Sequence, residues 1–199
     1  MDISYSYKKR KRANNILLIL MGKSASGKSY IAKNLEIKHG FHRIVTTTSR
    51  PMRKGETQDI DYHFISKDDF LNKIDNDYFV EYQNYETPSG IWYYGTSYES
   101  LANIDDEKKY VVILTPNGYK ELIQKVNIPH KAIYVYASYS TLMKRLKKRN
   151  DKNDFPQRRL ERDNEDFKGV EFIVDKLVYN NDGEDIDKVI EKIIKIMEG

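Results

Sequence analysis

The sequence contains no cysteine, so it can form neither a disulfide bond nor a metal site with thiolate ligands. It also has no apolar run as long as a membrane-spanning helix, and its first residues lack the pattern of a secretory signal. Its four histidines do not have the spacing of metal ligands. We therefore expect a cytoplasmic protein without a membrane partner, and 199 residues suffice for one domain with a small subdomain.

Positive charge is concentrated at the N-terminus. The chain has a formal net charge of +4, and the basic run 8–12 (KKRKR) supplies this excess. Such a run is found both in nucleic-acid-binding segments and in solvated tails, and we expect residues 1–14 to be a basic, disordered tail. Because the rest of the chain carries equal numbers of cations and acids, it gives no electrostatic reason to bind nucleic acid.

Residues 22–29 read GKSASGKS, which is the G-x-x-x-x-G-K-S pattern of a phosphate-binding P-loop. An apolar run at 16–21 precedes it and a helical segment follows it, so the order is strand, loop and helix. In such a loop, backbone N–H groups and the helix dipole hold phosphates, the lysine reaches the β- and γ-phosphates, and the serine binds Mg²⁺. The pattern predicts an ATP site with Ser29 as metal ligand, Lys28 as a catalytic residue, and binding residues Gly22, Lys23, Ser24, Ala25, Ser26, Gly27, Lys28 and Ser29.

Strand-like and helix-like segments alternate along most of the chain, which predicts an α/β protein with a mostly parallel sheet between two layers of helices. The expected strands lie at 16–21, 41–46, 110–114, 131–137 and 176–180, and the expected helices at 28–39, 116–125, 140–149, 157–168 and from 186 onward. Residues 78–96 are rich in aromatic residues and predict two strands joined by a turn at 88–90. Thr115 is a residue type that caps the start of a helix, and Pro116 is a type that favours the first helical position.

A long polar segment at 47–59 carries Arg50 and Arg53. Two arginines three residues apart can form a receptor for a second phosphate, although arginines are also common in solvated loops. The segment TTTSRPMRKGE at 46–56, followed by DYHF at 61–64, resembles the acceptor-binding segment of guanylate kinases, which are P-loop nucleoside monophosphate kinases. The string YYGT at 93–96, an arginine-bearing helix and NND at 180–182 follow in the family's order, so the resemblance extends from about residue 15 onward.

The resemblance implies an organisation and a set of roles. It implies a guanylate-kinase-like domain over 15–199, with a core of 15–46 and 97–199, an acceptor-binding subdomain at about 47–96 and a lid at about 150–156. It further implies that Arg145, Arg149 and Arg159 are catalytic, that Asn180 lies near the adenine of ATP, and that the acceptor is bound by Thr46, Arg50, Arg53, Tyr62, Glu81, Tyr94 and Thr96. One carboxylate can accept from both N1–H and the amino group of guanine, so Glu81 favours guanine over adenine.

The implied function is ATP-dependent phosphoryl transfer, with Mg²⁺, from ATP to a nucleoside monophosphate, with GMP or dGMP favoured, in a monomer or homodimer. The sequence departs from the family where an Asp-x-Asp pattern is replaced by Ile113 and Thr115. An insert at about 86–92 either reshapes the acceptor pocket or lengthens a hairpin, and Asp59 stands where the family has glycine. These departures leave open a P-loop kinase for a different acceptor, or an interaction module with weak or no catalysis.

Overall fold

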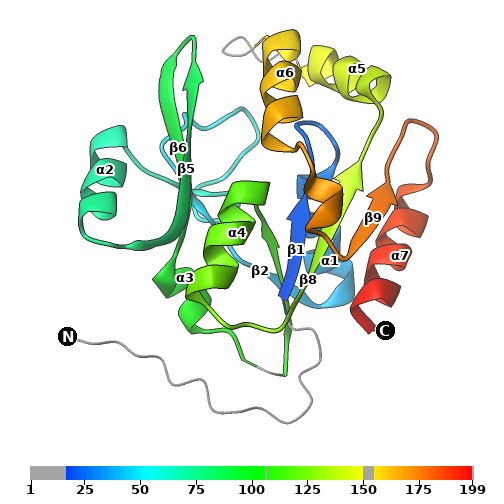
Figure 1. The fold of residues 1–199 in the computed structure, drawn as a ribbon, viewed down its shortest axis with the longest axis horizontal. Helices are drawn as coiled ribbons and strands as arrows, with labels where there is room; N and C mark the ends of the chain where they lie inside the picture. The colour runs from blue at the N-terminus through cyan, green and yellow to red at the C-terminus, as the bar shows by residue number, and fades with distance from the viewer. Residues whose placement is uncertain (1–16, 106, 150–154, 199) are drawn as a thin grey trace.

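A five-stranded parallel sheet forms the centre of the computed structural model, which describes residues 17–105, 107–149 and 155–198 (Figure 1). The predicted tail at 1–14 and most of the predicted lid, 150–154, lie outside the described residues. The strands follow the order β2 (Phe41–Arg43), β7 (Lys109–Ile113), β1 (Leu17–Met21), β8 (His130–Tyr136) and β9 (Lys176–Tyr179). Leu17 of β1 pairs with Tyr110 on one side and with His130 on the other, both in parallel register.

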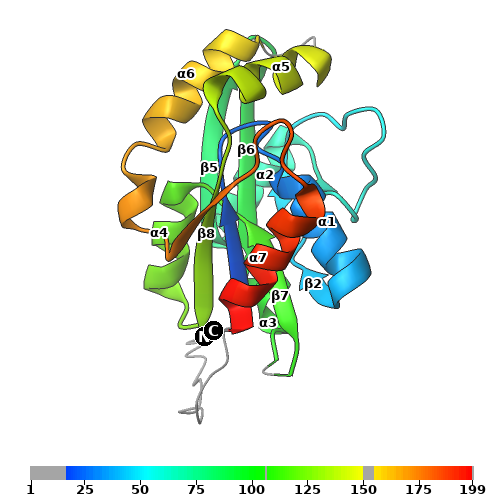
Figure 2. The same cartoon turned by 90° about the vertical axis from the view of Figure 1, so that its right-hand side faces the viewer.

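The central strand β1 consists of five buried apolar residues, as expected for a strand covered on both faces. Leu17, Ile19 and Met21 pack into one core cluster with Leu122 of α4 (Pro116–Lys125). The intervening residues of β1 pack into a second cluster with the helices α1 (Lys28–His39) and α7 (Ile186–Glu198). The side-chain alternation of β1 therefore separates two helical layers, which Figure 2 shows on opposite sides of the sheet and which confirm the predicted three-layer fold.

A separate four-stranded mixed sheet has the order β4 (His63–Phe64), β3 (Thr47–Thr48), β6 (Gly90–Ser97) and β5 (Phe79–Thr87). β5 and β6 form an antiparallel hairpin, and Glu86 pairs with Ile91 near its tip, so the insert at 86–92 forms the end of this hairpin. The helices α2 (Lys67–Asp75) and α3 (Tyr98–Ala102) flank this sheet. Figure 1 shows the hairpin standing beside the central sheet.

Two expected segments differ from the structure. The strand expected at 41–46 ends at Arg43, because the chain then leaves the central sheet and Thr47 pairs with Gly95 of β6. The polar segment 47–59 consequently begins with the short strand β3. The remaining helices are α5 (Tyr139–Arg149), α6 (Pro156–Asp166) and the short 3₁₀ segment Val170–Phe172. No helix in the described part of the chain has both the length and the apolar character needed to cross a membrane.

Candidate functional site

The P-loop lies between the end of β1 and the start of α1. A Cβ atom at position 22 would lie 2.6 Å from both Ser26 Oγ and the carbonyl oxygen of Val135, so only glycine fits there. Gly27 has φ +102°, which favours glycine, at the position before the helix starts. The ammonium group of Lys28 donates to the carbonyl oxygens of Gly22 at 2.5 Å and Lys23 at 3.0 Å. The loop thus has the closed shape of a phosphate receptor.

Lys28 is surrounded by other charges. Burial is the main cause that lowers the pKa of Lys28 to about 8; the negative charge of Asp163 opposes this shift, and the cations Arg159 and Arg149 add to it. The structure therefore brings the predicted residues Lys28, Arg149 and Arg159 within electrostatic reach of one another. Such a cluster of cations stabilises polyphosphate charge when a nucleotide is bound.

Side chains from later elements support the P-loop backbone. The amide of Asn180, which follows β9, donates to the carbonyl oxygen of Ser26 at 2.7 Å. Arg145 of α5 donates to the carbonyl oxygen of Ala25 at 3.4 Å and to Asp182 at 3.2 Å. The predicted residues Arg145 and Asn180 thus contact the loop directly, whereas Ser29 is exposed on the first turn of α1.

The helix α6 also contacts the P-loop, through one of its faces. Arg159, a predicted residue, donates from Nε to the hydroxyl of Ser24 at 2.6 Å. Lys23 donates to the side-chain oxygen of Asn164 at 2.5 Å, and the backbone N–H of Ser24 donates to Asp163 Oδ2 at 2.6 Å. Neither Asp163 nor Asn164 was expected at the site, because a highly charged helical segment is typical of a solvated surface.

A second cationic site lies in the arginine loop, which we define as residues 50–56. The guanidinium of Arg50 is 2% exposed and donates to both carboxylate oxygens of Glu56, at 2.8 and 2.9 Å. Glu56 also accepts from the backbone N–H of Arg53 at 2.7 Å. Within the described residues, Arg50 Nε is buried without a hydrogen-bond partner. A buried donor on a fixed guanidinium is suited to bind an anion.

Opposing effects set the ionisation of this pair. Burial disfavours the charge on Arg50, but its hydrogen bonds to Glu56 raise the pKa of Arg50 above its usual value. Burial likewise opposes ionisation of Glu56, while its bonds from Arg50 and Arg53 lower the pKa of Glu56. Both groups are therefore charged at neutral pH. Glu56 belongs to the segment that carries the family resemblance, but its spacing alone did not indicate its role.

Aromatic rings surround Arg50. The rings of Tyr62 and Phe64 each lie 5.5 Å from its guanidinium carbon, which is within cation–π distance. Tyr62 also contacts Tyr94 edge to face at 6.0 Å between ring centroids, and burial raises the pKa of Tyr62. The structure thus brings together the predicted residues Arg50, Tyr62 and Tyr94. Predicted Thr46 lies just before β3, where its carbonyl oxygen accepts from His63 N at 2.9 Å.

Glu81 on β5 is buried, and its carboxyl group faces the start of α4. The hydroxyl of Thr96 donates to Glu81 Oε1 at 2.6 Å, while a Cβ atom at position 118 would lie 2.5 Å from Oε2. Burial raises the pKa of Glu81 to about 7, and the hydrogen bond from Thr96 limits this rise. Thr115 caps α4 by accepting from Gly118 N at 3.1 Å. Ile113 packs in the cluster with α1.

A polar pocket of about 240 Å³ lies between β5, the start of α4 and α6. Tyr85 and Arg162 line it, and the Arg162 guanidinium carbon is 5.6 Å from the centre of the Tyr85 ring. Burial raises the pKa of Tyr85, and the negative charges of Asp166, Asp163 and Glu81 raise it further. The charges that act on Tyr85 therefore come both from α6, the helix that contacts the P-loop, and from Glu81. Neither Tyr85 nor Arg162 was expected at the site, because their positions depend on the packing of α6 beside the hairpin.

Comparisons with known proteins agree with this geometry. The sequence model of the family described as guanylate kinase matches residues 14–198. A guanylate kinase of Fusobacterium nucleatum is 29% identical over 184 residues, which cover 92% of this chain and 95% of that protein. A guanylate kinase of Wolinella succinogenes is 40% identical over 103 residues, which cover 51% of this chain but only 46% of that protein. The crystal structure of a guanylate kinase from Anaplasma phagocytophilum has the same fold, with a TM-score of 0.69 and 21% identity over 94% of this chain and 86% of that chain.

Proposed function

Because the chain belongs to the guanylate kinase family, in which ATP phosphorylates GMP to GDP, we propose a role in this reaction for each of the two anion receptors. The P-loop binds the triphosphate of ATP, and the arginine loop binds the phosphate of GMP or dGMP. The observation that supports this assignment best is the second receptor: Arg50 is buried and flanked by two aromatic rings, and within the described residues its Nε has no hydrogen-bond partner. A protein that only bound or hydrolysed ATP would have no use for it.

On the donor side, the N–H groups of the P-loop and Lys28 hold the phosphates, and Asn180 lies near the adenine. In the described part of the chain, no group of three or more His, Cys, Asp or Glu side chains is arranged to hold a metal. This fits Mg²⁺ that is bound mainly by phosphates and water, as is usual at kinase sites, with the exposed hydroxyl of Ser29 as a protein ligand. Bound Mg²⁺ would neutralise negative charge on the phosphates.

On the acceptor side, Arg50, Arg53, Tyr62 and Tyr94 bind the phosphate of the monophosphate. Glu81, with the hydroxyls of Thr96 and Thr46, reads the base. An ionised Glu81 accepts from the two adjacent N–H donors of guanine, whereas adenine would leave this buried charge unpaired. Glu81 and Thr96 are already hydrogen-bonded to one another, so the base-reading group is held in place.

The reaction needs positioning and charge stabilisation, and it needs no covalent intermediate on the protein. An oxygen of the acceptor phosphate attacks the γ-phosphorus of ATP in line, and the β–γ bridging bond breaks to release ADP. Lys28, Arg145, Arg149 and Arg159 stabilise the charge that spreads over the transferring group. Burial of the two phosphates between these groups keeps water from competing as acceptor.

An acceptor screen tests the proposal. The chain is incubated with ATP and Mg²⁺ and with GMP, dGMP, AMP, UMP or CMP, and ADP formation is measured. We expect GMP and dGMP to be the preferred acceptors, and deletion of residues 1–14 to leave activity unchanged. Preference for another monophosphate would contradict the role of Glu81, and ATP binding without transfer to any acceptor would indicate an interaction module.

A further inference from the structure

The carboxylate of Asp163 lies inside the P-loop receptor. It accepts from the backbone N–H of Ser24 at 2.6 Å, although the two residues are 139 positions apart in the sequence. Asp163 is 8% exposed, and a carboxylate buried to this degree needs charged or hydrogen-bonded partners. Its partner here is a main-chain donor of the very loop whose donors serve to bind phosphate.

The surroundings of Asp163 are those of a phosphate group. Its negative charge raises the pKa of Lys28, against the effects of burial and of the neighbouring cations Arg159 and Arg149. An anion that accepts from a P-loop N–H and neutralises the P-loop lysine does the same two things as a nucleotide phosphate. Because like charges repel strongly in such a confined site, the carboxylate and the phosphates cannot both occupy it without cost.

The contact is built into the fold. Arg159 and Asp163, four residues apart, share one face of α6, and Asn164 follows directly after Asp163; all three contact P-loop residues. Figures 1 and 2 show α6 at the end of the molecule where the loop after β1 lies. The helix therefore presents one anion together with a cation and an amide to the loop, and Asp163 is the only one of the three that carries a negative charge.

We infer that Asp163 competes with the phosphates of ATP for the P-loop and that ATP displaces its carboxylate from Ser24. This inference rests on the proposed function, because it requires that the P-loop binds ATP. It makes Asp163 a positioning residue, which holds the loop and its cations in place until phosphates take over. Its removal should strengthen ATP binding, which is the opposite of what the loss of a purely supporting contact would do.

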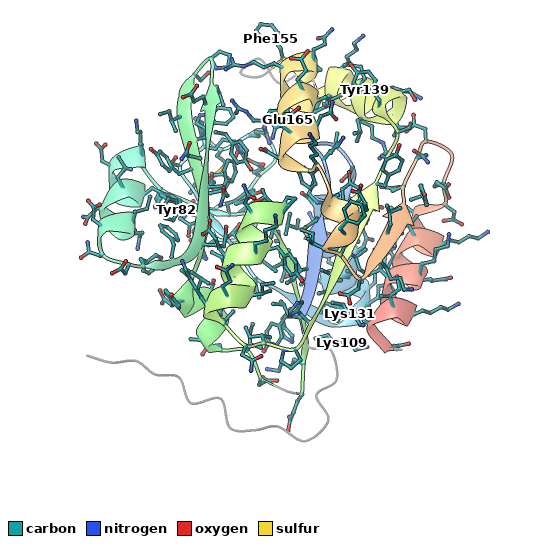
Figure 3. The ribbon with its side chains drawn as sticks, viewed as in Figure 1. Tyr82, Lys109, Lys131, Tyr139, Phe155 and Glu165 are labelled. Carbon is teal, nitrogen blue, oxygen red and sulfur yellow. The ribbon has the colours of Figure 1, made fainter. Side chains whose placement is uncertain are left out.

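The substitution Asp163→Asn isolates the charge, because the amide oxygen can still accept from Ser24 N–H. We expect the Kd for ATP to fall about tenfold, which corresponds to about 1.4 kcal/mol, while the Kd for GMP stays within about twofold. Isothermal titration calorimetry measures both, with Mg²⁺ and with excess EDTA. The matched control is Glu165→Gln, which removes a negative charge from an exposed position on the same helix (Figure 3) and should leave the Kd for ATP unchanged.

Each other result overturns the inference. An unchanged Kd for ATP in Asp163→Asn would mean that the carboxylate does not compete. A Kd raised only with Mg²⁺ would assign Asp163 to the metal, and a Kd raised in both conditions would assign it to support of the loop. Lys28→Ala tests separately the premise that the P-loop binds ATP. If this substitution abolishes ATP binding while Asp163→Asn has no effect, the proposed function stands and the inference about Asp163 is wrong. A wild-type chain that does not bind ATP would overturn both.

A measurement on the wild-type chain covers the case in which the variant does not fold. In a carboxyl-labelled sample, ATP should change the ¹³C chemical shift of the Asp163 side chain, because the carboxylate loses its bond from Ser24. GMP should leave this signal in place, and the Glu165 signal should not respond to either nucleotide. An Asp163 signal that is insensitive to saturating ATP overturns the inference.

Discussion

The two proposed anion receptors of this protein are assembled from very different stretches of chain. In the arginine loop, Arg50 and the carboxylate that holds it, Glu56, are six residues apart. In the P-loop, Ser24 and Ser26 are held by Asp163 and Asn180, which are 139 and 154 residues away. The arginine loop is therefore a local unit, whereas the P-loop depends on the positions of α6 and of the segment after β9. A substitution in the arginine loop should therefore affect only the acceptor site, whereas the effects of a substitution in the P-loop should extend to other parts of the molecule.

The largest expected effect is that of Lys28→Ala, which removes the central cation of the long-range receptor. We expect kcat to fall by about 10³-fold or more, because in the proposed reaction Lys28 stabilises the charge that develops on the transferring group. Steady-state assays with ATP and GMP measure this, and Lys33→Ala, on the exposed side of α1, serves as the matched control. A Lys28→Ala protein with near-normal turnover would remove the P-loop from the reaction.

Next in size is Arg53→Ala, which tests whether the arginine loop acts as a local unit. We expect the KM for GMP to rise about 100-fold, because a charge-assisted contact to the acceptor phosphate is lost, and the KM for ATP to change little. The neighbouring substitution Lys54→Ala, at an exposed position of the same loop, should have no such effect. Equal increases in both KM values would show that the two receptors are not independent.

Glu81→Gln tests whether the arginine-loop side of the comparison also includes recognition of the base of the acceptor. The amide cannot accept from both guanine donors, so we expect the ratio of kcat/KM for GMP to that for AMP to fall about 30-fold. An unchanged ratio would exclude Glu81 from base reading.

The same variant should be more stable than the wild type at alkaline pH. The pKa of Glu81 is about 7 in the folded chain against 4.5 for an ordinary glutamate, so between these values the folded state holds a proton that the unfolded state has released. Stability contributed by the protonated carboxyl is thus lost as pH rises through this window. We expect Glu81→Gln to raise the free energy of unfolding by about 2 kcal/mol at pH 8 and to have little effect at pH 4. Denaturant titrations at both pH values would check this, and equal effects at both would argue against a raised pKa.

The smallest expected effect is that of Thr115→Ala. Loss of the cap on Gly118 N–H should lower stability by about 1 kcal/mol and the Tm by about 2–4 °C. If capping is its role, the preference for GMP over AMP should not change. Thr115→Ser, which retains the hydroxyl, should have the stability of the wild type, and a change in base preference in Thr115→Ala would assign Thr115 to the acceptor pocket.

Local signals made much of the fold predictable. Helix α1 spans the predicted residues 28–39 and helix α4 the predicted 116–125. Gly40 ends the first and Thr115 caps the second, through hydrogen bonds to residues that are at most five positions away. The two-residue strand β3 has no such signal. It exists because Thr47 pairs with both His63 and Gly95, and Thr48 donates its hydroxyl to the carbonyl oxygen of Tyr93, 45 residues away.

The residues of the candidate site likewise fall into two groups, those whose geometry depends on nearby residues and those that depend on distant ones. The P-loop glycines, Lys28 and the Arg50 loop are visible in the sequence, because their geometry depends on short spacings. The roles of Asp163, Tyr85 and Arg162 depend on how α6 packs beside the P-loop and the β5–β6 hairpin, and the sequence around each is that of an ordinary charged helix or aromatic strand. The insert at 86–92 forms the end of the hairpin, and its residue Glu86 lines the polar pocket beside α6.

The lowered pKa of Lys28 also bears on how nucleotide binding will be observed. With a pKa of about 8, a substantial share of the Lys28 side chains is neutral in a mildly alkaline buffer. Phosphates placed beside this amine favour its ammonium form, so ligand binding near pH 8 draws protons from the buffer. The heat measured in such a titration therefore includes the ionisation heat of the buffer itself. Two buffers of different ionisation enthalpy would report how many protons the protein takes up with each nucleotide.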